Sequence, residues 1–447
     1  MRQHNKKQCL DTIQLLNEAY VEVANCIEKR QTESAIELLG QCQQGAISIG
    51  NLIENAGNEG ADEIHRLEEY CEAVWILSEE IRAGAGINIF QEEKKLRKML
   101  QYVSDGIENR ISTQREVVFL PYKASMWDSL ESVWREINDD PDVTAIVIPI
   151  PYYDKNPDGT FKQPHYEGLQ FPGDVPVVEF QKYNIEERHP DAIYIHNPYD
   201  GANFVTSVHP DYYSSRLKDL TDELVYIPYY VLDEIDPFNK AAVKGVEHFI
   251  TVPGVVNAHK VIVQSENWRK AYIDVMTEHA GEKTRSYWEQ KIVAKESPKF
   301  ERVKNLTAED HRLPAEWEKL VVKPDGSRKK IIFYNTSVTA LLDADDRMLD
   351  KIKRVLGFFK ENSEEVVLLW RPHPLIEATL TAMRPELYEK YRQIVDEYRA
   401  EGFGIYDDSP ELYRAIAVSD AYYGDHSSVV QLYQQTGKPV MIQNCYV

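Results

Sequence analysis

The sequence predicts an α/β protein with two Rossmann-like domains that face a cleft and follow an N-terminal bundle of helices. Three observations support this architecture. Before residue 110, apolar residues recur every three or four positions, which is the period of an amphipathic helix. From Glu116 onward, short apolar runs alternate with helical stretches, as in βαβ units that build a parallel sheet. A polar stretch at 280–327 divides this α/β region into two halves.

Residues 1–112 form the predicted bundle. Apolar side chains such as Ile13 and Leu16 share one helical face, and the segment has no proline although the chain contains 22. Glycine-containing turns at 55–60 and 84–86 divide it into three or four antiparallel helices. We expect the bundle to form a homo-oligomer, to dock a partner, or to act as a simple scaffold.

Residues 113–280 form the first predicted Rossmann-like domain. Its helical stretches, such as 126–137, alternate with short apolar runs bounded by polar loops. Continuous apolar runs of this length are typical of strands in a parallel sheet that helices cover on both faces. The expected strands lie at 117–120, 144–148, 177–180, 192–195, 224–227 and 261–263.

Residues 281–327 are predicted to connect the two halves, because they are polar and contain several prolines. Residues 328–447 then form the second Rossmann-like domain. A cleft between two such domains is a usual place for a ligand. The expected strands of this second domain lie at 330–334, 366–370, 404–406, 421–423 and 439–442.

Charge, the length of apolar runs and the spacing of possible metal ligands exclude several classes of protein. Lys and Arg total 51 against 73 Asp and Glu, which argues against nucleic-acid binding, because that binding depends on neutralising phosphates. No apolar run approaches the roughly 20 residues that span a bilayer. The segment 186–191, which contains His189, lacks the spacing of a zinc site, so no metal ligands are predicted. We expect a cytoplasmic protein that is at most peripheral to the inner face of the membrane.

Polar residues follow each of four predicted strands in the second domain. The carboxyl ends of parallel strands meet at one edge of a sheet, where open α/β sheets bind ligands. A helix that begins at this edge also offers free backbone N–H groups to an anion. The sequence therefore predicts a nucleotide-phosphate pocket here. The residues concerned are Asn335, Thr336, Arg371, His373, Asp408, Asp425, Ser427 and Ser428.

The same region resembles the CDP-glycerol glycerophosphotransferase family, the polymerases and primases of teichoic-acid synthesis. The resemblance covers residues 255–447 well and 116–254 in outline, and it does not reach the N-terminal bundle. The similar motifs are Arg-x-His-Pro at 371–374, the acidic stretch at 407–420, Asp-x-Ser-Ser at 425–428 and Gly-Lys-Pro at 437–439.

The resemblance implies a GT-B fold and a transferase. Such an enzyme would move glycerol phosphate, or a related polyol or sugar phosphate, from a CDP-linked donor to a hydroxyl of a cell-wall or surface glycopolymer. The acceptor would be polymeric or lipid-linked, and no cofactor or metal would be required. Arg371, His373, Asp425, Ser427 and Ser428 would hold the donor pyrophosphate, and Asn335, Thr336 and Asp408 would line the nucleotide pocket.

A general base must take the proton from the acceptor hydroxyl. The family carries a Trp-His-Gly element for this purpose, whereas the matching segment here, 227–230, is Ile-Pro-Tyr-Tyr. His196 directly follows an apolar strand and is the candidate base in this chain. Two other functions remain open: a GT-B nucleotide-sugar glycosyltransferase or epimerase, and a non-catalytic nucleotide-binding scaffold.

Overall fold

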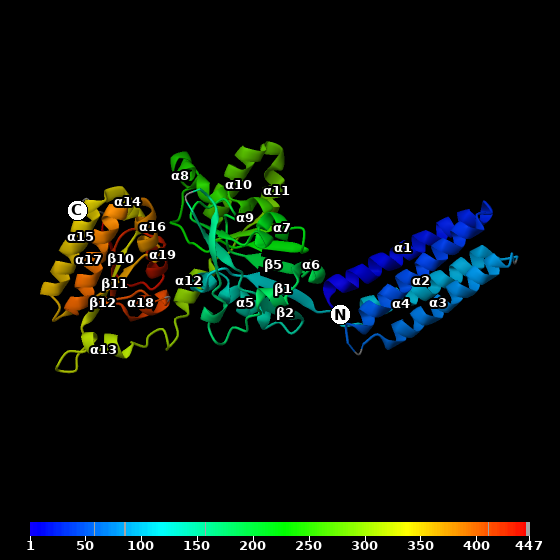
Figure 1. The fold of residues 1–447 in the computed structure, drawn as a ribbon, viewed down its shortest axis with the longest axis horizontal. Coiled ribbons are helices and arrows are strands. Elements are labelled where there is room, and N and C mark those ends of the chain that lie inside the picture. The colour runs from blue at the N-terminus through cyan, green and yellow to red at the C-terminus, as the bar shows by residue number, and fades with distance from the viewer. Residues whose placement is uncertain (58, 85, 157, 410, 444–447) are drawn as a thin grey trace.

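The computed structural model describes residues 1–57, 59–84, 86–156, 158–409 and 411–443. They form three bodies in a row: a helical bundle, a middle α/β domain and a C-terminal α/β domain (Figure 1). Two Rossmann-type domains preceded by helices confirm the predicted fold class. In the described residues, no helix is both long and apolar enough to cross a membrane.

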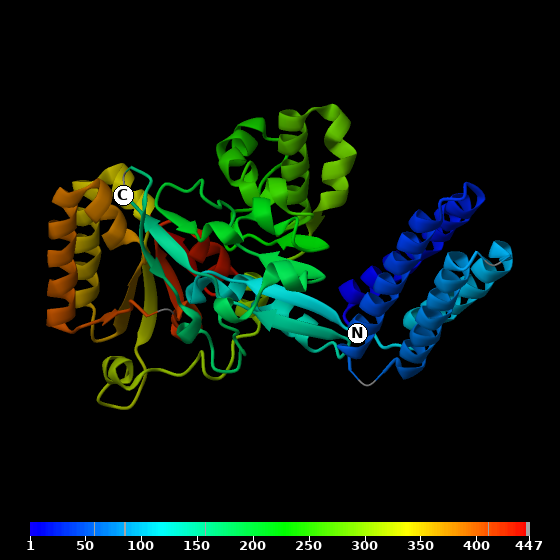
Figure 2. The same ribbon diagram turned by 45° about the vertical axis from the view of Figure 1, so that its right-hand side comes forward.

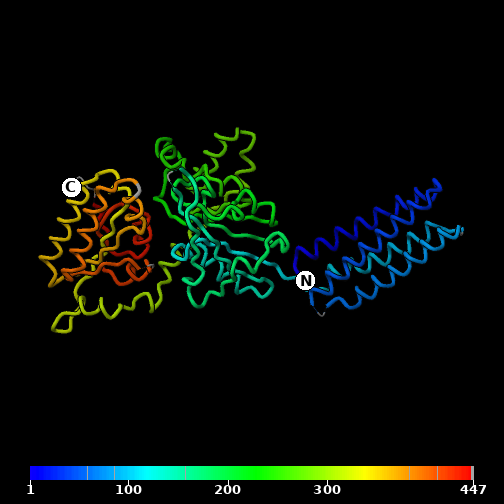
Figure 3. Tube along the Cα trace, in the orientation of Figure 1, coloured from blue at the N-terminus to red at the C-terminus, as the bar shows by residue number. Residues whose placement is uncertain are grey.

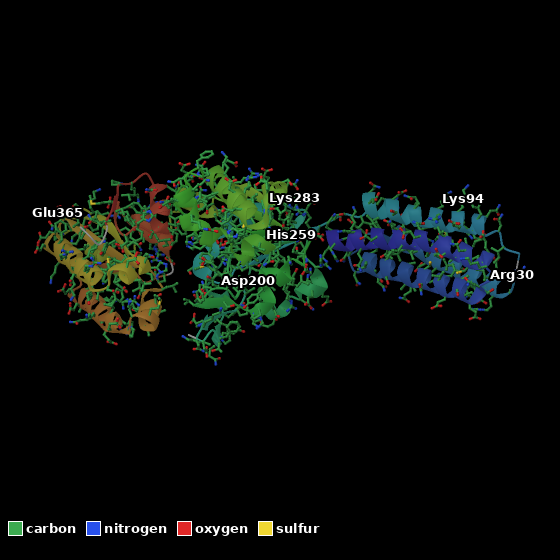
Figure 4. The ribbon with its side chains drawn as sticks, turned by 90° about the horizontal axis from the view of Figure 1, so that it is seen from above. Arg30, Lys94, Asp200, His259, Lys283 and Glu365 are labelled. Atoms are coloured by element: carbon green, nitrogen blue, oxygen red, sulfur yellow. The ribbon has the colours of Figure 1, made fainter. Side chains whose placement is uncertain are left out.

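Four antiparallel helices build the bundle, and α1 packs against both α2 and α4. The buried side chains of α1 follow spacings of four and three residues, from Cys9 and Ile13 to Leu16, as in coiled-coil packing. Figure 4 shows Arg30 at the end of the bundle that points away from the other domains. The bundle therefore meets the middle domain at its opposite end only. Its helices are α1 (Gln3–Glu28), α2 (Thr32–Glu54), α3 (Ala61–Arg82) and α4 (Ile89–Asn109).

A six-stranded parallel sheet forms the centre of the middle domain, in the order β2-β1-β5-β7-β8-β9. A further bridge joins Val177 to Val147 at the free side of β2, which gives the strand order of a Rossmann fold. Its strands are β1 (Arg115–Leu120), β2 (Val143–Val147), β5 (Ala192–Ile195), β7 (Glu223–Tyr226), β8 (Lys260–Val263) and β9 (Ile292–Ala294). Its helices are α5 (Glu131–Asn138), α6 (Ile185–Arg188), α7 (Ser214–Leu217), α8 (Lys240–Ile250), α9 (Pro253–Asn257), α10 (Glu266–Ala280), α11 (Arg285–Lys291) and α12 (Pro298–Lys304).

Three features of the middle domain differ from the prediction. The run at 177–180 contributes a single bridge instead of a strand. β9 lies in the stretch predicted as a connection and is an edge strand of the sheet. Two strands between β2 and β5 and a third strand after β5 form a small antiparallel sheet. The sequence did not predict this sheet, because its strands are short and largely polar. It consists of β3 (Tyr152–Lys155), β4 (Phe161–His165) and β6 (Thr206–Val208).

The C-terminal domain has a five-stranded parallel sheet in the order β12-β11-β10-β13-β14, again a Rossmann order. Strand β11 lies next to the central strand β10 and is apolar from Val366 to Trp370, because both of its faces are buried: Leu368 and Trp370 pack on one side, Val367 and Leu369 on the other. Its strands are β10 (Lys330–Thr336), β11 (Val366–Pro372), β12 (Ile405–Tyr406), β13 (Ala421–Gly424) and β14 (Val440–Ile442). Its helices are α13 (Ala315–Val321), α14 (Val338–Ala344), α15 (Asp346–Glu361), α16 (Ile376–Met383), α17 (Pro385–Glu401), α18 (Leu412–Val418) and α19 (Ser428–Gln434).

Polar contacts join the middle and C-terminal domains, which lie next to each other in both ribbon views (Figure 2). The carboxylate of Asp128 accepts hydrogen bonds from Lys299 at 2.6 Å and from the hydroxyl of Tyr413 at 2.5 Å. Asp233, in the loop after β7, lies 2.7 Å from His426, which follows β13. Since Asp233 and His426 both follow the carboxyl ends of strands, these edges of the two sheets face each other, as in the GT-B arrangement.

Candidate functional site

The carboxyl ends of β11, β10 and β13 lie side by side at one edge of the C-terminal sheet. The strand register pairs Asn335 with both Arg371 and Gly424, so the loops after these strands begin at one level. Between β10 and β13 the strand order changes direction, and open α/β sheets bind ligands at such points. The predicted convergence of the strand ends is therefore present in the backbone.

A pocket of about 310 Å³ opens at the carboxyl ends of β11 and β12. Three arginines and four carboxylates line it together with two tyrosines, so it is strongly polar without an excess of positive charge. Carboxylates suit the hydroxyls of a ribose, whereas a diphosphate needs cationic or N–H donors. Among the lining residues are Arg371, His373, Glu377, Tyr391, Arg392, Asp396, Arg399, Tyr406, Asp407 and Asp408.

Arg371 is a buried anchor of this pocket. Its guanidinium forms an ion pair with Asp407, and both side chains are less than a tenth exposed. Its Nη2 also donates to the carbonyl oxygen of Ser409 at 2.7 Å. These contacts hold the loop after β12 against the end of β11. Because the charge of Arg371 is compensated by Asp407, Arg371 positions the pocket wall and offers a ligand only part of its donor capacity.

His373 lies at the mouth of the pocket with a solvent-exposed surface. Its Nδ1 accepts a hydrogen bond from the backbone N–H of Leu375 at 3.1 Å, which fixes the ring. The protein atoms around it, and then the positive charge of Lys123, lower its pKa below the usual value of 6.5. At neutral pH the imidazole is therefore uncharged. Its proton is on Nε2, which makes this atom a hydrogen-bond donor directed away from the loop.

Lys123 belongs to the middle domain and lies near enough to His373 of the C-terminal domain for its charge to lower the pKa of that imidazole. It follows β1 by three residues, and its Nζ lies 4.8 Å from the ring centroid of Tyr152. Burial lowers the pKa of Lys123, and the nearby carboxylates of Glu167 and Asp154 act in the opposite direction. Lys123 of the middle domain and the neutral imidazole of His373 in the C-terminal domain are therefore close enough to interact electrostatically.

Asn335 and Asp425 link strand ends and do not line the pocket. The amide of Asn335 donates to the carbonyl oxygen of Arg371 at 2.9 Å, and its Oδ1 accepts from Ser427 at 3.0 Å. The carboxylate of Asp425 accepts from the backbone N–H of Ser337 and forms a buried ion pair with Lys351, both at 2.8 Å. These hydrogen bonds hold the loops after β10 and β13 together.

The structure thus separates the predicted donor-binding residues into two groups. Arg371, His373 and Asp408 line one pocket, and their binding role stays a prediction. The other predicted residues are absent from the lining of this pocket. The assignment of Asp425 to the pyrophosphate needs correction, because its carboxylate is negatively charged, buried and paired with Lys351. Thr336 is fully buried and accepts from Trp370, Ser427 caps α19, and Ser428 is exposed.

His196 does not have the surroundings of a general base. The side chain is fully buried, its Nε2 accepts from the backbone N–H of Tyr122 at 3.2 Å, and its Nδ1 lies 2.9 Å from the hydroxyl of Ser129. Since Ser129 donates its own proton to the carbonyl oxygen of Met126, it accepts from the imidazole. Both ring nitrogens are therefore used, and the role predicted for His196 is corrected to that of a buried link between β5 and the loop after β1.

We predict that acidification destabilises the chain partly through His196. Burial, and then the charge of Lys299, lower its pKa to about 3. A histidine in an unfolded chain has a pKa of about 6.5, so below that pH the unfolded state binds a proton that the folded state does not. Stability present above pH 6.5 is then lost as the pH falls toward 3, by about 1.4 kcal/mol per pH unit.

Urea titrations of wild type and His196→Gln at pH 7 and pH 5 measure this contribution. Wild type is the more stable at pH 7, and its advantage should shrink by about 2 kcal/mol at pH 5, because glutamine does not titrate. A stability difference between wild type and His196→Gln that is the same at both pH values would contradict a lowered pKa of His196.

Sequence reasoning did not find Lys123 or Glu167. Glu167 accepts hydrogen bonds from the backbone N–H of Ala124 at 2.8 Å and from the hydroxyl of Tyr152 at 2.6 Å, so it anchors the loop that carries Lys123. The available signal was the position of Lys123 just after an apolar strand. Nothing in the sequence shows that this strand end faces residue 373 of the other domain.

No known protein family matches the sequence, and no curated protein is similar to it in sequence. Among solved structures, MnaA of S. aureus bound to UDP aligns with 74% of this chain and 79% of its own at 10% identity, with a TM-score of 0.44. A putative UDP-N-acetylglucosamine 2-epimerase from Listeria monocytogenes aligns over the same shares at 13% identity and a TM-score of 0.44. The wall teichoic acid polymerase TagF aligns with 85% of this chain and 78% of its own at 14% identity and a TM-score of 0.41. At such identities the similarity is one of fold.

Proposed function

We propose that the chain is a GT-B transferase that moves glycerol phosphate, or a related polyol or sugar phosphate, from a CDP-linked donor to a hydroxyl of a cell-wall or surface glycopolymer. The observation that supports it most is the pocket at the ends of β11 and β12, which His373 lines. Lys123 of the opposite domain lies near enough to His373 for its charge to lower the pKa of that imidazole. The motif resemblance in the same loops supplies the donor class.

In this proposal the nucleoside occupies the 310 Å³ pocket. The ring of Tyr406, which carries the guanidinium of Arg399 at 4.2 Å on one face, is part of the wall against which a base can pack. The carboxylates of Glu377 and Asp396 are hydrogen-bond acceptors for ribose hydroxyls. The diphosphate then extends out of the pocket toward the cleft.

The diphosphate would lie between His373 and Lys123. An acceptor oxygen attacks the β-phosphorus, the bond from this phosphorus to the bridging oxygen breaks, and CMP leaves with an additional negative charge. The Nε2–H of His373 and the ammonium of Lys123 are placed to stabilise that charge as it develops. The acceptor, polymeric or lipid-linked, would approach from the middle domain at the inner face of the membrane.

A specific observation favours a second candidate function, a nucleotide-binding protein without transferase activity. The acceptor hydroxyl must lose a proton, and the enclosed imidazole of His196 does not reach it. A binding protein would keep the pocket and need no base.

The test combines binding and turnover for CDP-glycerol and for UDP- and GDP-linked sugars. We expect CDP-glycerol to raise the melting temperature, since a ligand at 100 times its Kd contributes about 2.7 kcal/mol to stability. Release of CMP in the presence of a polyol-phosphate acceptor supports the transferase. Stabilisation without CMP release from any acceptor supports the binding protein, and stabilisation by a UDP-sugar alone contradicts the CDP-linked donor.

A further inference from the structure

The first turn of α1 is part of the joint between the bundle and the middle domain. The backbone of Gln114 donates to the carbonyl oxygen of Met1 at 2.8 Å and accepts from the N–H of Gln3 at 3.0 Å, so residues 1–3 lie beside the start of β1. The N-terminus is accordingly found where the bundle meets the middle domain (Figures 1 and 3). This joint is at the amino ends of the strands of the middle sheet, whereas the donor pocket is in the C-terminal domain.

Three metal-ligating side chains from distant parts of the sequence converge at this joint. His4 comes from α1, His189 from the loop before β5, and Asp222 from the loop before β7. One ligand atom of each lies within 4.8 Å of those of the other two. The Nε2 of His189 is 3.5 Å from Oδ1 of Asp222, and the ring centroids of the two histidines are 4.4 Å apart.

Two polar atoms near this cluster have no partner among the described residues. The Nδ1 of His4 is buried without a hydrogen bond, and so is Oδ1 of Asp191, whose other oxygen accepts from the backbone N–H of Glu116 at 2.6 Å. A buried polar atom without a partner costs about 1–3 kcal/mol, so an unfilled arrangement of this kind is unfavourable. A cation that takes the lone pair of a neutral imidazole removes that cost for His4.

The charges around the cluster are compatible with a cation. The carboxylate of Asp222 contributes a negative charge to the cluster itself. The guanidinium of Arg2 donates to the carbonyl oxygen of Arg188, the residue before His189, and the carboxylate of Glu116 lies between the guanidinium groups of Arg2 and Arg188. Glu116 therefore compensates part of the positive charge beside the cluster.

The geometry points to a zinc site formed by His4, His189 and Asp222. Two imidazole nitrogens and one carboxylate oxygen are a donor set that Zn²⁺ takes in tetrahedral sites, with water as the fourth ligand. The ion links the first turn of α1 to two loops of the middle domain. Its role is to fasten the bundle, because its ligands come from the bundle and the middle domain, whereas the donor pocket is in the C-terminal domain. This inference does not depend on the proposed function.

The test uses the untagged full-length chain after removal of metals with a chelator. Calorimetric titration with ZnCl₂ should show one ion bound per chain, and Co²⁺ should give the visible absorption of a tetrahedral complex. Asp222→Asn, at an exposed position, and His4→Gln should each weaken zinc binding by more than about 100-fold. Changing a residue that only hydrogen-bonds to a metal ligand already costs up to about 100-fold, and these two variants lose a ligand itself. His65→Gln is the matched control, since His65 lies 3.5 Å from Glu68 on the exposed face of α3.

Limited proteolysis checks the role in fastening the bundle. Zinc should slow cleavage at the joint around residue 113 in wild type and in His65→Gln, and it should have no effect in Asp222→Asn. Absence of zinc binding to the wild-type chain, or equal zinc affinity of wild type and both ligand variants, would overturn the proposal. Zinc binding that leaves cleavage at the joint unchanged would overturn its fastening role.

Discussion

Replacing His373 by alanine lowers the rate of CMP release by about 10²–10³-fold in our account, the usual cost of removing one donor that stabilises a developing anion. The imidazole is neutral because its surroundings and Lys123 lower its pKa, so it acts as an N–H donor from Nε2. The variant should fold normally, since His373 is exposed at the mouth of the pocket. The measurement is steady-state CMP release from CDP-glycerol, together with the melting temperature.

His311→Ala is the matched control for this variant, because His311 is also exposed and lies in the segment between the two domains. It should keep the wild-type rate. Wild-type turnover by His373→Ala would remove His373 from the mechanism. A melting temperature that falls together with the rate would show a structural role instead.

Replacing Asp407 by alanine lowers the free energy of unfolding by about 3–5 kcal/mol, because it leaves the guanidinium of Arg371 buried without its counter-charge. The neighbouring residue provides the control. Asp408 pairs with Arg399 at the surface, with 68% and 49% of the two side chains exposed, and exposed ion pairs contribute about 0–1 kcal/mol. Urea unfolding of Asp407→Ala and Asp408→Ala measures the difference, and equal losses in the two variants would contradict the buried anchor.

Periodicity was sufficient to predict the bundle and most of both parallel sheets. Ile13 and Leu16 are buried in α1 as their spacing indicates, and the run that ends at Trp370 forms most of strand β11. The small sheet β4-β3-β6 was missed because its strands are short and β4 is exposed along its whole length. β9 was missed for a similar reason, since three residues carry too little pattern to distinguish a strand from a loop.

The site could be predicted only in part, because a sequence shows which residue follows a strand but not which groups its side chain contacts. Arg371 and Asp425 lie at the carboxyl ends of β11 and β13, the strands on either side of β10, yet one lines the pocket and the other pairs with Lys351. His196 follows a strand as predicted, but burial removes it from any substrate. His189 was set aside as a metal ligand because its local spacing has no second histidine, and His4 comes from another domain.

A crystal structure of the chain with CDP tests the central claim most directly. The account predicts the nucleoside in the pocket at the ends of β11 and β12, and the diphosphate within hydrogen-bonding distance of Nε2 of His373 on the side that faces Lys123. A diphosphate bound elsewhere in the protein, out of reach of both side chains, would contradict it.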